Sequence, residues 1–215
     1  FEFLIRQWAA YAGALTDPAE WLGWASRPLS LPPQDTTTVP PLSDMPAMMR
    51  RRIDRLGRMA CQVAYWCHEP RSDVPVVFAS RYGDAARSLA LMGDLAKGEP
   101  LSPTGFGLSV HNAVAALYSM ARGDTANAVV VAAGRATVAA ALTEAAGLLA
   151  DGAPEVLVVY YESPLPADYA CFHDEAVLDY AWAWRLAAAD SSTKAAGDAR
   201  LALSVGEPSV GAPPV

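Results

Sequence analysis

Apolar runs alternate with amphipathic stretches through the middle of this 215-residue chain. Continuous apolar runs at 74–80, 128–132 and 155–161 are typical of buried parallel strands, because both faces of such strands are covered. Helical spacing of apolar residues separates these runs, at 84–97, 110–122 and 136–149. Strands that alternate with helices predict a layered α/β domain, α-β-α, with a mostly parallel sheet.

Two more strands are expected near the ends of this domain. The segment 3–11 has an apolar strand pattern, and 181–187 is a candidate strand, so the predicted sheet has five strands. A further candidate strand at 201–205 lies in the last part of the chain. We therefore divide the chain into a domain at 1–187 and a C-terminal strand or extension with a flexible tail at 188–215.

A proline-rich connector precedes the central region. Six prolines between 28 and 46 leave little room for regular structure, so we expect an extended loop that lies on the domain. Ser43 and Asp44 can then cap a long helix over 48–68, whose apolar residues repeat with the 3.6-residue helical period.

Composition and charge exclude several classes of protein. Apolar residues make up 53% of the chain and charged residues 18%, which excludes a disordered chain. The net charge of −7 falls entirely on residues 71–215, and a nucleic-acid binder would carry the opposite sign. No run of 18 apolar residues or secretory signal is visible, and three cysteines form no disulfide framework, so a cytoplasmic setting is expected.

No standard catalytic or cofactor motif stands out. The sequence contains no Walker loop, no G-x-S-x-G nucleophile elbow and no dinucleotide fingerprint. The spacing of its cysteines and histidines matches no common zinc pattern, and Cys61 and Cys67 fall on the apolar side of a predicted helix. We expect neither a metal nor a cofactor.

A cluster of arginines marks the start of the predicted helix 48–68. It consists of Arg50, Arg51, Arg52, Arg55 and Arg58. Arg51, Arg55 and Arg58 fall on one helical stripe, although cations near a helix N-terminus oppose the macrodipole. Two interpretations stay open: a solvated face beside Asp54, or a docking patch for an acidic partner such as a carrier protein.

The most specific signal lies between 101 and 162. This stretch contains L-S-P-T-G-F-G-L-S-V-H-N, then N-A-V-V-V-A-A-G-R-A-T-V, then G-A-P-E-V-L-V-V-Y-Y-E. It resembles the central part of β-ketoacyl synthases, the condensing enzymes of fatty-acid and polyketide assembly. In that family a helix bearing Asn precedes a glycine turn, and a strand then ends at the nucleophilic Cys that caps the next helix. Laid over this sequence without gaps, Asn112, Gly123 and Ala145 match the helix Asn, the turn glycine and a small residue of the nucleophile helix.

The same register places Arg135 where the family has its cysteine. Condensation needs a thiolate to accept the acyl group, and a guanidinium stays protonated and cannot serve. The family also uses two histidines from the second half of a chain about twice as long, and His173 stands in no such motif. The resemblance therefore implies a degenerate active site without a catalytic residue. Its region comprises Ala133, Gly134, Arg135, Ala136, Thr137, Phe106, His111 and Asn112.

Shorter matches at 29–46, 49–52, 79–84 and 101–112 narrow the resemblance to short, single-half, chain-length-factor-like members of the family. These members occur in gene clusters for aryl-polyene and xanthomonadin-type pigments. The resemblance implies a thiolase-like half-domain that acts as a non-catalytic accessory subunit in polyketide or fatty-acid-type chain biosynthesis. Its implied partners are a β-ketoacyl synthase and an acyl carrier protein, with Arg51, Arg55 and Arg58 as the carrier-docking residues.

The resemblance also implies dimerisation through the strand 128–132, which would pair antiparallel with a second subunit. An uncovered apolar edge strand is an aggregation risk, which favours such pairing, although a place inside the sheet would also cover it.

Alternatives remain for the chemistry. Ser80 or Ser109 could carry acyl transfer or hydrolysis of a thioester, and a structural homodimer would need no acyl ligand. Arg135 either pairs with a carboxylate such as Glu144 or Asp124, or contacts an acyl-carrier or malonyl anion at a helix start.

Overall fold

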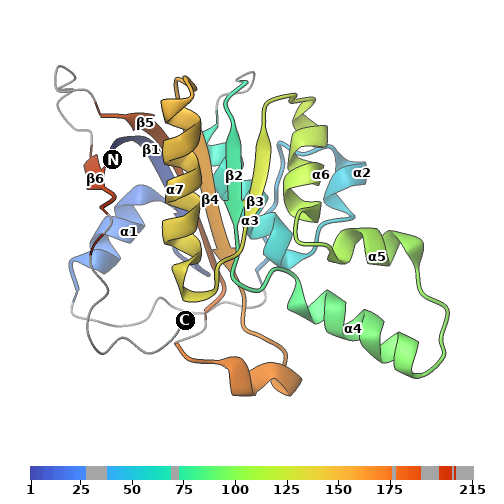
Figure 1. Cartoon of the computed structure of the whole chain (residues 1–215). Helices are drawn as coiled ribbons and strands as arrows, with labels where there is room; N and C mark the ends of the chain where they lie inside the picture. Colours follow the sequence, from blue (N-terminus) through green and yellow to red (C-terminus); the bar gives the residue numbers. More distant parts are fainter. Residues whose placement is uncertain (28–37, 69–72, 176–177, 190–198, 205, 207–215) are drawn as a thin grey trace.

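A single six-stranded sheet forms the centre of the molecule. The computed structural model describes residues 1–27, 38–68, 73–175, 178–189, 199–204 and 206. The strands are β1 (Glu2–Tyr11), β2 (Val76–Ala79), β3 (Ala128–Val131), β4 (Val156–Glu162), β5 (Tyr180–Ala188) and β6 (Ala199–Ala202). Their order across the sheet is β3-β2-β4-β5-β1-β6 (Figure 1).

Parallel pairing is limited to one half of this sheet. β2 runs parallel to β3 and β4, whereas the pairs β4–β5, β5–β1 and β1–β6 are antiparallel. The prediction of five strands is therefore one short, because β6 from the C-terminal extension adds to the edge of β1. The mainly parallel arrangement expected from the sequence applies to β3-β2-β4, where helices connect the strands.

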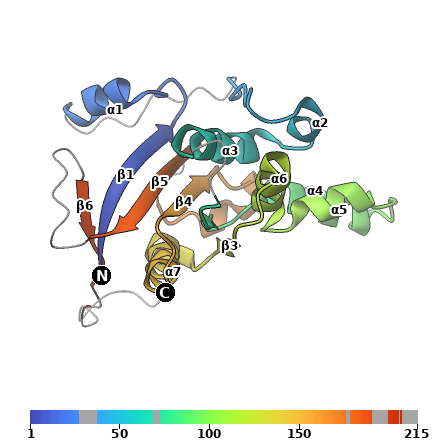
Figure 2. The same ribbon diagram turned by 90° about the horizontal axis from the view of Figure 1, so that it is seen from above.

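Helices cover both faces of the sheet, which confirms the layered α/β class. The helices are α1 (Pro18–Ala25), α2 (Ala47–Arg50), α3 (Arg55–Cys67), α4 (Ala85–Ala96), α5 (Pro103–Ser109), α6 (Ala113–Arg122) and α7 (Thr137–Ala150), with short 3₁₀ helices η1 (Gly134–Ala136) and η2 (Ala167–Phe172). α3 and α6 lie on one face and α7 on the other (Figure 2). α4 and α5 extend beyond the edge of the sheet at β3 (Figure 1).

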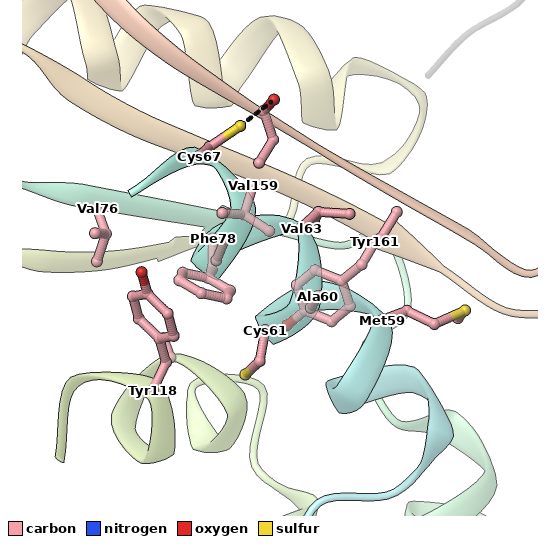
Figure 3. Packing of buried hydrophobic residues seen from close by; sticks show 14 of the residues in the cluster. Met59, Ala60, Cys61, Val63, Cys67, Val76, Phe78, Tyr118, Val159 and Tyr161 are labelled. Carbon is pink, nitrogen blue, oxygen red and sulfur yellow. Dashed lines mark hydrogen bonds between the residues drawn. The ribbon is translucent and has the colours of Figure 1, made fainter. Parts of the chain in front are cut away.

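The main core fills the space between the sheet, α3 and α6. Phe78 of β2 lies beside Tyr118 of α6 and Tyr161 of β4, with ring centroids 5.5 and 6.2 Å apart (Figure 3). The Sγ of Cys67 donates to the carbonyl of Ala183 at 3.3 Å, which joins the end of α3 to β5. Each fully buried side chain of this size contributes about 1.5–3 kcal/mol to folding, so this core fixes α3 on the sheet.

The long helix predicted at 48–68 is two helices. α2 ends at Arg50, and α3 starts anew after Asp54, whose carboxylate accepts from the Gly57 N–H at 3.0 Å. A Cβ on Gly57 would lie 2.6 Å from Ile53 Cγ2, so the glycine lets the chain turn closely into α3. The predicted caps Ser43 and Asp44 are wrong, because α2 begins after Pro46 without a side-chain cap and Asp54 caps α3 instead.

The remaining predicted elements are present with shifted boundaries, whereas α1 and η2 are not among the predicted elements. The helix predicted at 110–122 begins at Ala113, and a separate helix, α5, precedes it. The connector at 28–46 falls within the described residues only from 38 onwards, and of the tail expected at 206–215 only residue 206 is described. Within the described residues, no helix is both long and apolar enough to pass through a membrane.

Candidate functional site

The loops after β2, β3 and β4 meet at one edge of the sheet. Because these strands are parallel, their carboxyl ends lie together, and such edges are where ligands bind in open α/β sheets. Ser80 and Arg81 follow β2, Gly134 and Arg135 follow β3, and Ser163 follows β4. This edge is the candidate site.

A sharp turn carries the chain from β3 into α7. Gly134 has φ +56°, a left-handed conformation that favours glycine. Thr137 is 1% exposed, and its Oγ1 accepts from the Ala133 N–H at 3.0 Å and donates to the Gly134 carbonyl at 2.6 Å. The turn places Arg135 immediately before α7, so five predicted site residues, 133–137, form one compact unit.

Arg135 pairs with an acidic side chain that the sequence analysis did not select. Its Nε lies 2.7 Å from Asp174 Oδ2, in the loop after η2. The predicted partners Glu144 and Asp124 are not used, and Asp124 pairs instead with Arg122 at 3.4 Å. Arg135 is 51% exposed as a side chain. Nothing local in the sequence marks Asp174, because it lies 39 residues from Arg135.

Glu162 is a second residue that sequence reasoning missed. It ends β4, is 7% exposed, and accepts from the Arg81 backbone N–H. Burial raises the pKa of its carboxyl to about 7, although hydrogen bonds from Arg81, Tyr160 and Ser80 act in the opposite direction. A carboxylate directly after a run of six apolar or aromatic residues was the available signal.

His111 supports the loop after β2. Its Nε2 lies 2.9 Å from the Ser80 carbonyl oxygen, and its ring fills the space where a Cβ on Gly83 would fall, 2.8 Å away. Gly83 also has φ +58°. Asn112 is the N-cap residue of α6 but makes no capping hydrogen bond with its side chain. The predicted site residue Phe106 lies in α5, 61% exposed, on a helix that packs against α4 and α6.

Neither serine is placed to attack a substrate. Ser80 is fully buried, where no substrate reaches its Oγ, which accepts from the Gly83 N–H at 2.8 Å and hydrogen-bonds to the buried Glu162 carboxylate. Ser109 Oγ donates to the Phe106 carbonyl at 2.8 Å. The ring of His111 contacts the backbone of Ser80 and not its hydroxyl. This geometry does not support the alternative of serine-dependent acyl transfer.

The three arginines proposed for carrier docking do not form one stripe. Arg51 lies between α2 and α3 and is exposed, as is Arg52. Arg55 pairs with Asp179 at 3.4 Å, and Arg58 NH2 donates to the Arg50 carbonyl at 3.0 Å. The guanidinium groups of Arg55 and Arg58 therefore stabilise the local fold. Arg51 is separated from them because the helix breaks between α2 and α3.

The three cysteines differ in burial and in their position relative to this edge. Cys61 and Cys67 are buried, and burial raises the pKa of the Cys67 thiol to about 12. Cys171 is exposed in η2. Among the described parts of the chain, no three His, Cys, Asp or Glu side chains are placed to hold a metal ion.

A cleft of about 190 Å³ adjoins the site between the starts of α3 and α4 and the loop 163–165. Asp54 and Asp84 cap these two helices, and Arg87 bridges them at 3.1 and 2.7 Å. Burial and the nearby Asp54 raise the pKa of Asp84 to about 6. Asp54, Asp84 and the Arg87 side chain between them connect α3 with α4.

The fold and the position of this edge define a thiolase-like ketosynthase half-domain. The β-ketoacyl synthase N-terminal domain family matches residues 21–211, and the chain belongs to this family. No curated protein matches the sequence.

Three solved structures show how far the similarity extends. A chain of the complex between the ketosynthase ApeO and its chain length factor ApeC from Xenorhabdus doucetiae is 26% identical, with a TM-score of 0.78, and the match covers 89% of this chain and 81% of that one. The ishigamide ketosynthase/chain length factor is 18% identical, with a TM-score of 0.68 over 89% and 63% of the two chains. A β-ketoacyl synthase from Burkholderia phymatum STM815 is 12% identical, with a TM-score of 0.66 over 86% and 59%. This chain thus spans less than two thirds of the latter two.

Proposed function

We propose that this protein is a non-catalytic, chain-length-factor-like subunit that pairs with a β-ketoacyl synthase in polyketide or fatty-acid-type chain biosynthesis, including the aryl-polyene type. The observation that carries the proposal is the similarity to a chain of the ApeO–ApeC complex over most of both chains. The match covers 81% of that chain, against 59% of the β-ketoacyl synthase from Burkholderia phymatum.

The chemistry of the candidate site supports a non-catalytic role. Arg135 stands at the turn where the family resemblance expects the nucleophile, and a guanidinium cannot form a thioester. The segment from β3 through α7 contains no cysteine, the thiols of Cys61 and Cys67 are buried, and the exposed Cys171 of η2 lies outside this strand–turn–helix unit. The partner would therefore supply the acyl-carrying thiolate.

The open edge of β3 supports pairing with another subunit. Val76 N–H donates to the Asn127 carbonyl at 2.8 Å and Ser80 N–H to the Val131 carbonyl at 3.3 Å. Since backbone groups alternate along a strand, the N–H and carbonyl groups of Ala128 and Val130 face away from β2. β3 carries no charged residue that would discourage pairing with another strand.

Exposed apolar residues are concentrated on and between α4, α5 and α6, next to this edge. Six of the twelve large hydrophobic residues that are exposed in the described structure lie there: Met92, Leu95, Leu101, Phe106, Val110 and Met120. α4 contacts α5, α5 contacts α6, and α6 contacts β3, so the residues share one region. A concentration of apolar side chains beside an open strand is typical of a protein interface.

Co-purification with the ketosynthase from the same genome tests this proposal. We expect a stable complex with the wild-type chain, and loss of the complex with Val130→Pro, which removes an outward N–H but no hydrogen bond to β2. Val130→Thr keeps that N–H and should still bind.

A second pair of variants tests the helical surface. Phe106→Asp should weaken the complex at least tenfold, whereas Leu22→Asp, at a residue of similar exposure on α1, should not. A ketosynthase that fails to bind the wild-type chain, or binds all four variants equally, would contradict the proposal.

A further inference from the structure

One carboxylate joins the three loops at the carboxyl edge of the parallel strands. Arg81 from the end of β2 binds Asp174 through two hydrogen bonds, NH1 to Oδ1 at 2.7 Å and NH2 to Oδ2 at 2.9 Å. Arg135 from the end of β3 adds Nε to Oδ2 at 2.7 Å and NH2 to the Asp174 carbonyl at 3.3 Å. Asp174 itself belongs to the segment 163–175 that follows β4.

The same segment is held by neighbouring contacts. Tyr82 Oη donates to the Phe172 carbonyl at 3.2 Å, and the Arg81 guanidinium lies 4.8 Å from the centre of the Tyr82 ring. Arg81 NH1 also lies 3.4 Å from Glu175 Oε1. The segment is therefore held against the turn at residues 133–137, across the edge where a ligand would enter.

Two guanidinium groups that share one carboxylate oxygen need an anion between them. Arg81 is 12% exposed as a side chain and Arg135 51%, so water screens the two charges mainly from the side of Arg135. The nearby Glu162 carboxylate receives the backbone N–H of Arg81 and not its guanidinium. Asp174 supplies the shared charge, and hydrogen bonds from Arg81 and then Arg135 hold the pKa of its carboxyl far below its ordinary value.

We propose that Arg81 and Arg135 form a binding site for a small carboxylate that the chain occupies with its own Asp174, so that the segment 163–175 closes the degenerate active site. The idea rests on the proposed function in one respect, namely that this edge is a former acyl site. The proposal gives Arg135 a structural role. The residue at the expected position of the nucleophile also holds the segment 163–175 over that position through Asp174.

Chemical rescue tests the proposal on the isolated chain. Asp174→Ala removes a carboxylate that differs from free acetate by little more than its backbone attachment. We expect this variant to lose hydrogen-exchange protection in 163–175 and to have a lower Tm than the wild type. Sodium acetate should restore both in a saturable way at millimolar concentrations, and sodium chloride at equal ionic strength should not.

Two further variants make the test specific. In Asp174→Ala combined with Arg135→Gln the acetate effect should disappear, and the wild type should respond equally to acetate and chloride. Acetate that acts equally on all three proteins, or on none, would overturn the proposal. If the double variant does not fold, ¹³C-acetate line broadening with Asp174→Ala alone decides, because no broadening excludes the site. Since no ketosynthase is present, the outcome is independent of whether this chain forms a complex with one.

Discussion

His68 Nδ1 lies 2.7 Å from the hydroxyl oxygen of Tyr118, and both side chains are buried between α3 and α6. Burial lowers the pKa of His68 to about 4, and the positive charge of Arg122 acts in the same direction. The other ring nitrogen, Nε2, has no hydrogen-bond partner among the described residues. The pair is therefore built for a neutral imidazole.

This relationship predicts a loss of stability in acid. Because unfolded His68 binds a proton below its ordinary pKa of about 6.5 and the folded residue does not until about 4, stability should fall as the pH drops from 6.5 to 4. We expect a loss of about 2 kcal/mol from this residue. Urea unfolding of wild type and His68→Gln at pH 7 and pH 4 measures it, since the variant lacks this titration. Equal pH dependence of the two proteins would contradict the prediction.

The raised pKa of Glu162 predicts that the stability of the fold decreases as the pH rises near neutrality. Its folded pKa of about 7 lies above the ordinary value of 4.5, so the folded state takes up a proton that the unfolded state does not. Its contribution is complete below pH 4.5 and is lost as the pH rises through 7, which amounts to about 1 kcal/mol between pH 6 and pH 8. Glu162→Gln should remove this part of the pH dependence. Denaturation curves at the two pH values decide, and an unchanged slope in the variant would exclude the assignment.

The hydrogen bonds of Thr137 at the turn predict that removing its hydroxyl lowers the stability of the fold. Thr137→Val keeps the side-chain shape but leaves the partly buried Ala133 N–H without its acceptor, at a cost of about 1 kcal/mol. Thr143→Val is the control, because Thr143 is exposed on the same helix and its hydroxyl only donates to the Ala139 carbonyl at 2.9 Å. Thermal unfolding should separate the two variants, and equal Tm values would refute the role of Thr137.

Two glycines should respond to alanine with opposite signs. Gly134→Ala forces a side chain into φ +56° and should destabilise by about 1 kcal/mol. Gly147 lies within α7, and a Cβ added to it would have no neighbouring atom within 4 Å. Gly147→Ala should therefore stabilise by about 0.5–1 kcal/mol. Chemical denaturation measures both, and the same sign for both would contradict the turn geometry.

Charge reversal at the helix break tests carrier docking. Arg51→Glu and Arg52→Glu together should weaken binding of the acyl carrier protein several-fold at low salt, with less effect at high salt. Lys97→Glu, at an exposed cation beyond α4, serves as the control. Binding that is indifferent to both changes would contradict the prediction that this surface docks a carrier protein.

The sequence predicts the central elements well because their signals are local. The apolar runs of β2, β3 and β4 and the helix after Gly134 need no distant residue to be recognised. The order of strands and helices also predicts that residues 133–137, which follow β3, lie at the carboxyl edge of the parallel strands. The break before α3 is missed because the apolar period continues across it, while the Asp54 cap decides the geometry.

The charged partners at the site lie beyond the reach of such patterns. Arg81 and Asp174 are 93 residues apart. The apolar run before Glu162 indicates a buried acid, but its hydrogen bond from the Arg81 N–H depends on how the loop after β2 folds. Sequence periodicity reports which face of an element is apolar. It does not report which loops cross that face after folding.

β1 lies between β5 and β6 in the sheet. The first strand of the chain therefore pairs with the last two. A chain that emerges from the ribosome must therefore keep the apolar residues of β1 unpaired until residues beyond 180 are available. Contacts of such long sequence separation slow folding, and the unpaired strand is exposed to wrong partners in the meantime. We expect the nascent chain to depend on chaperones, or on early association with another subunit, until β5 and β6 have been made.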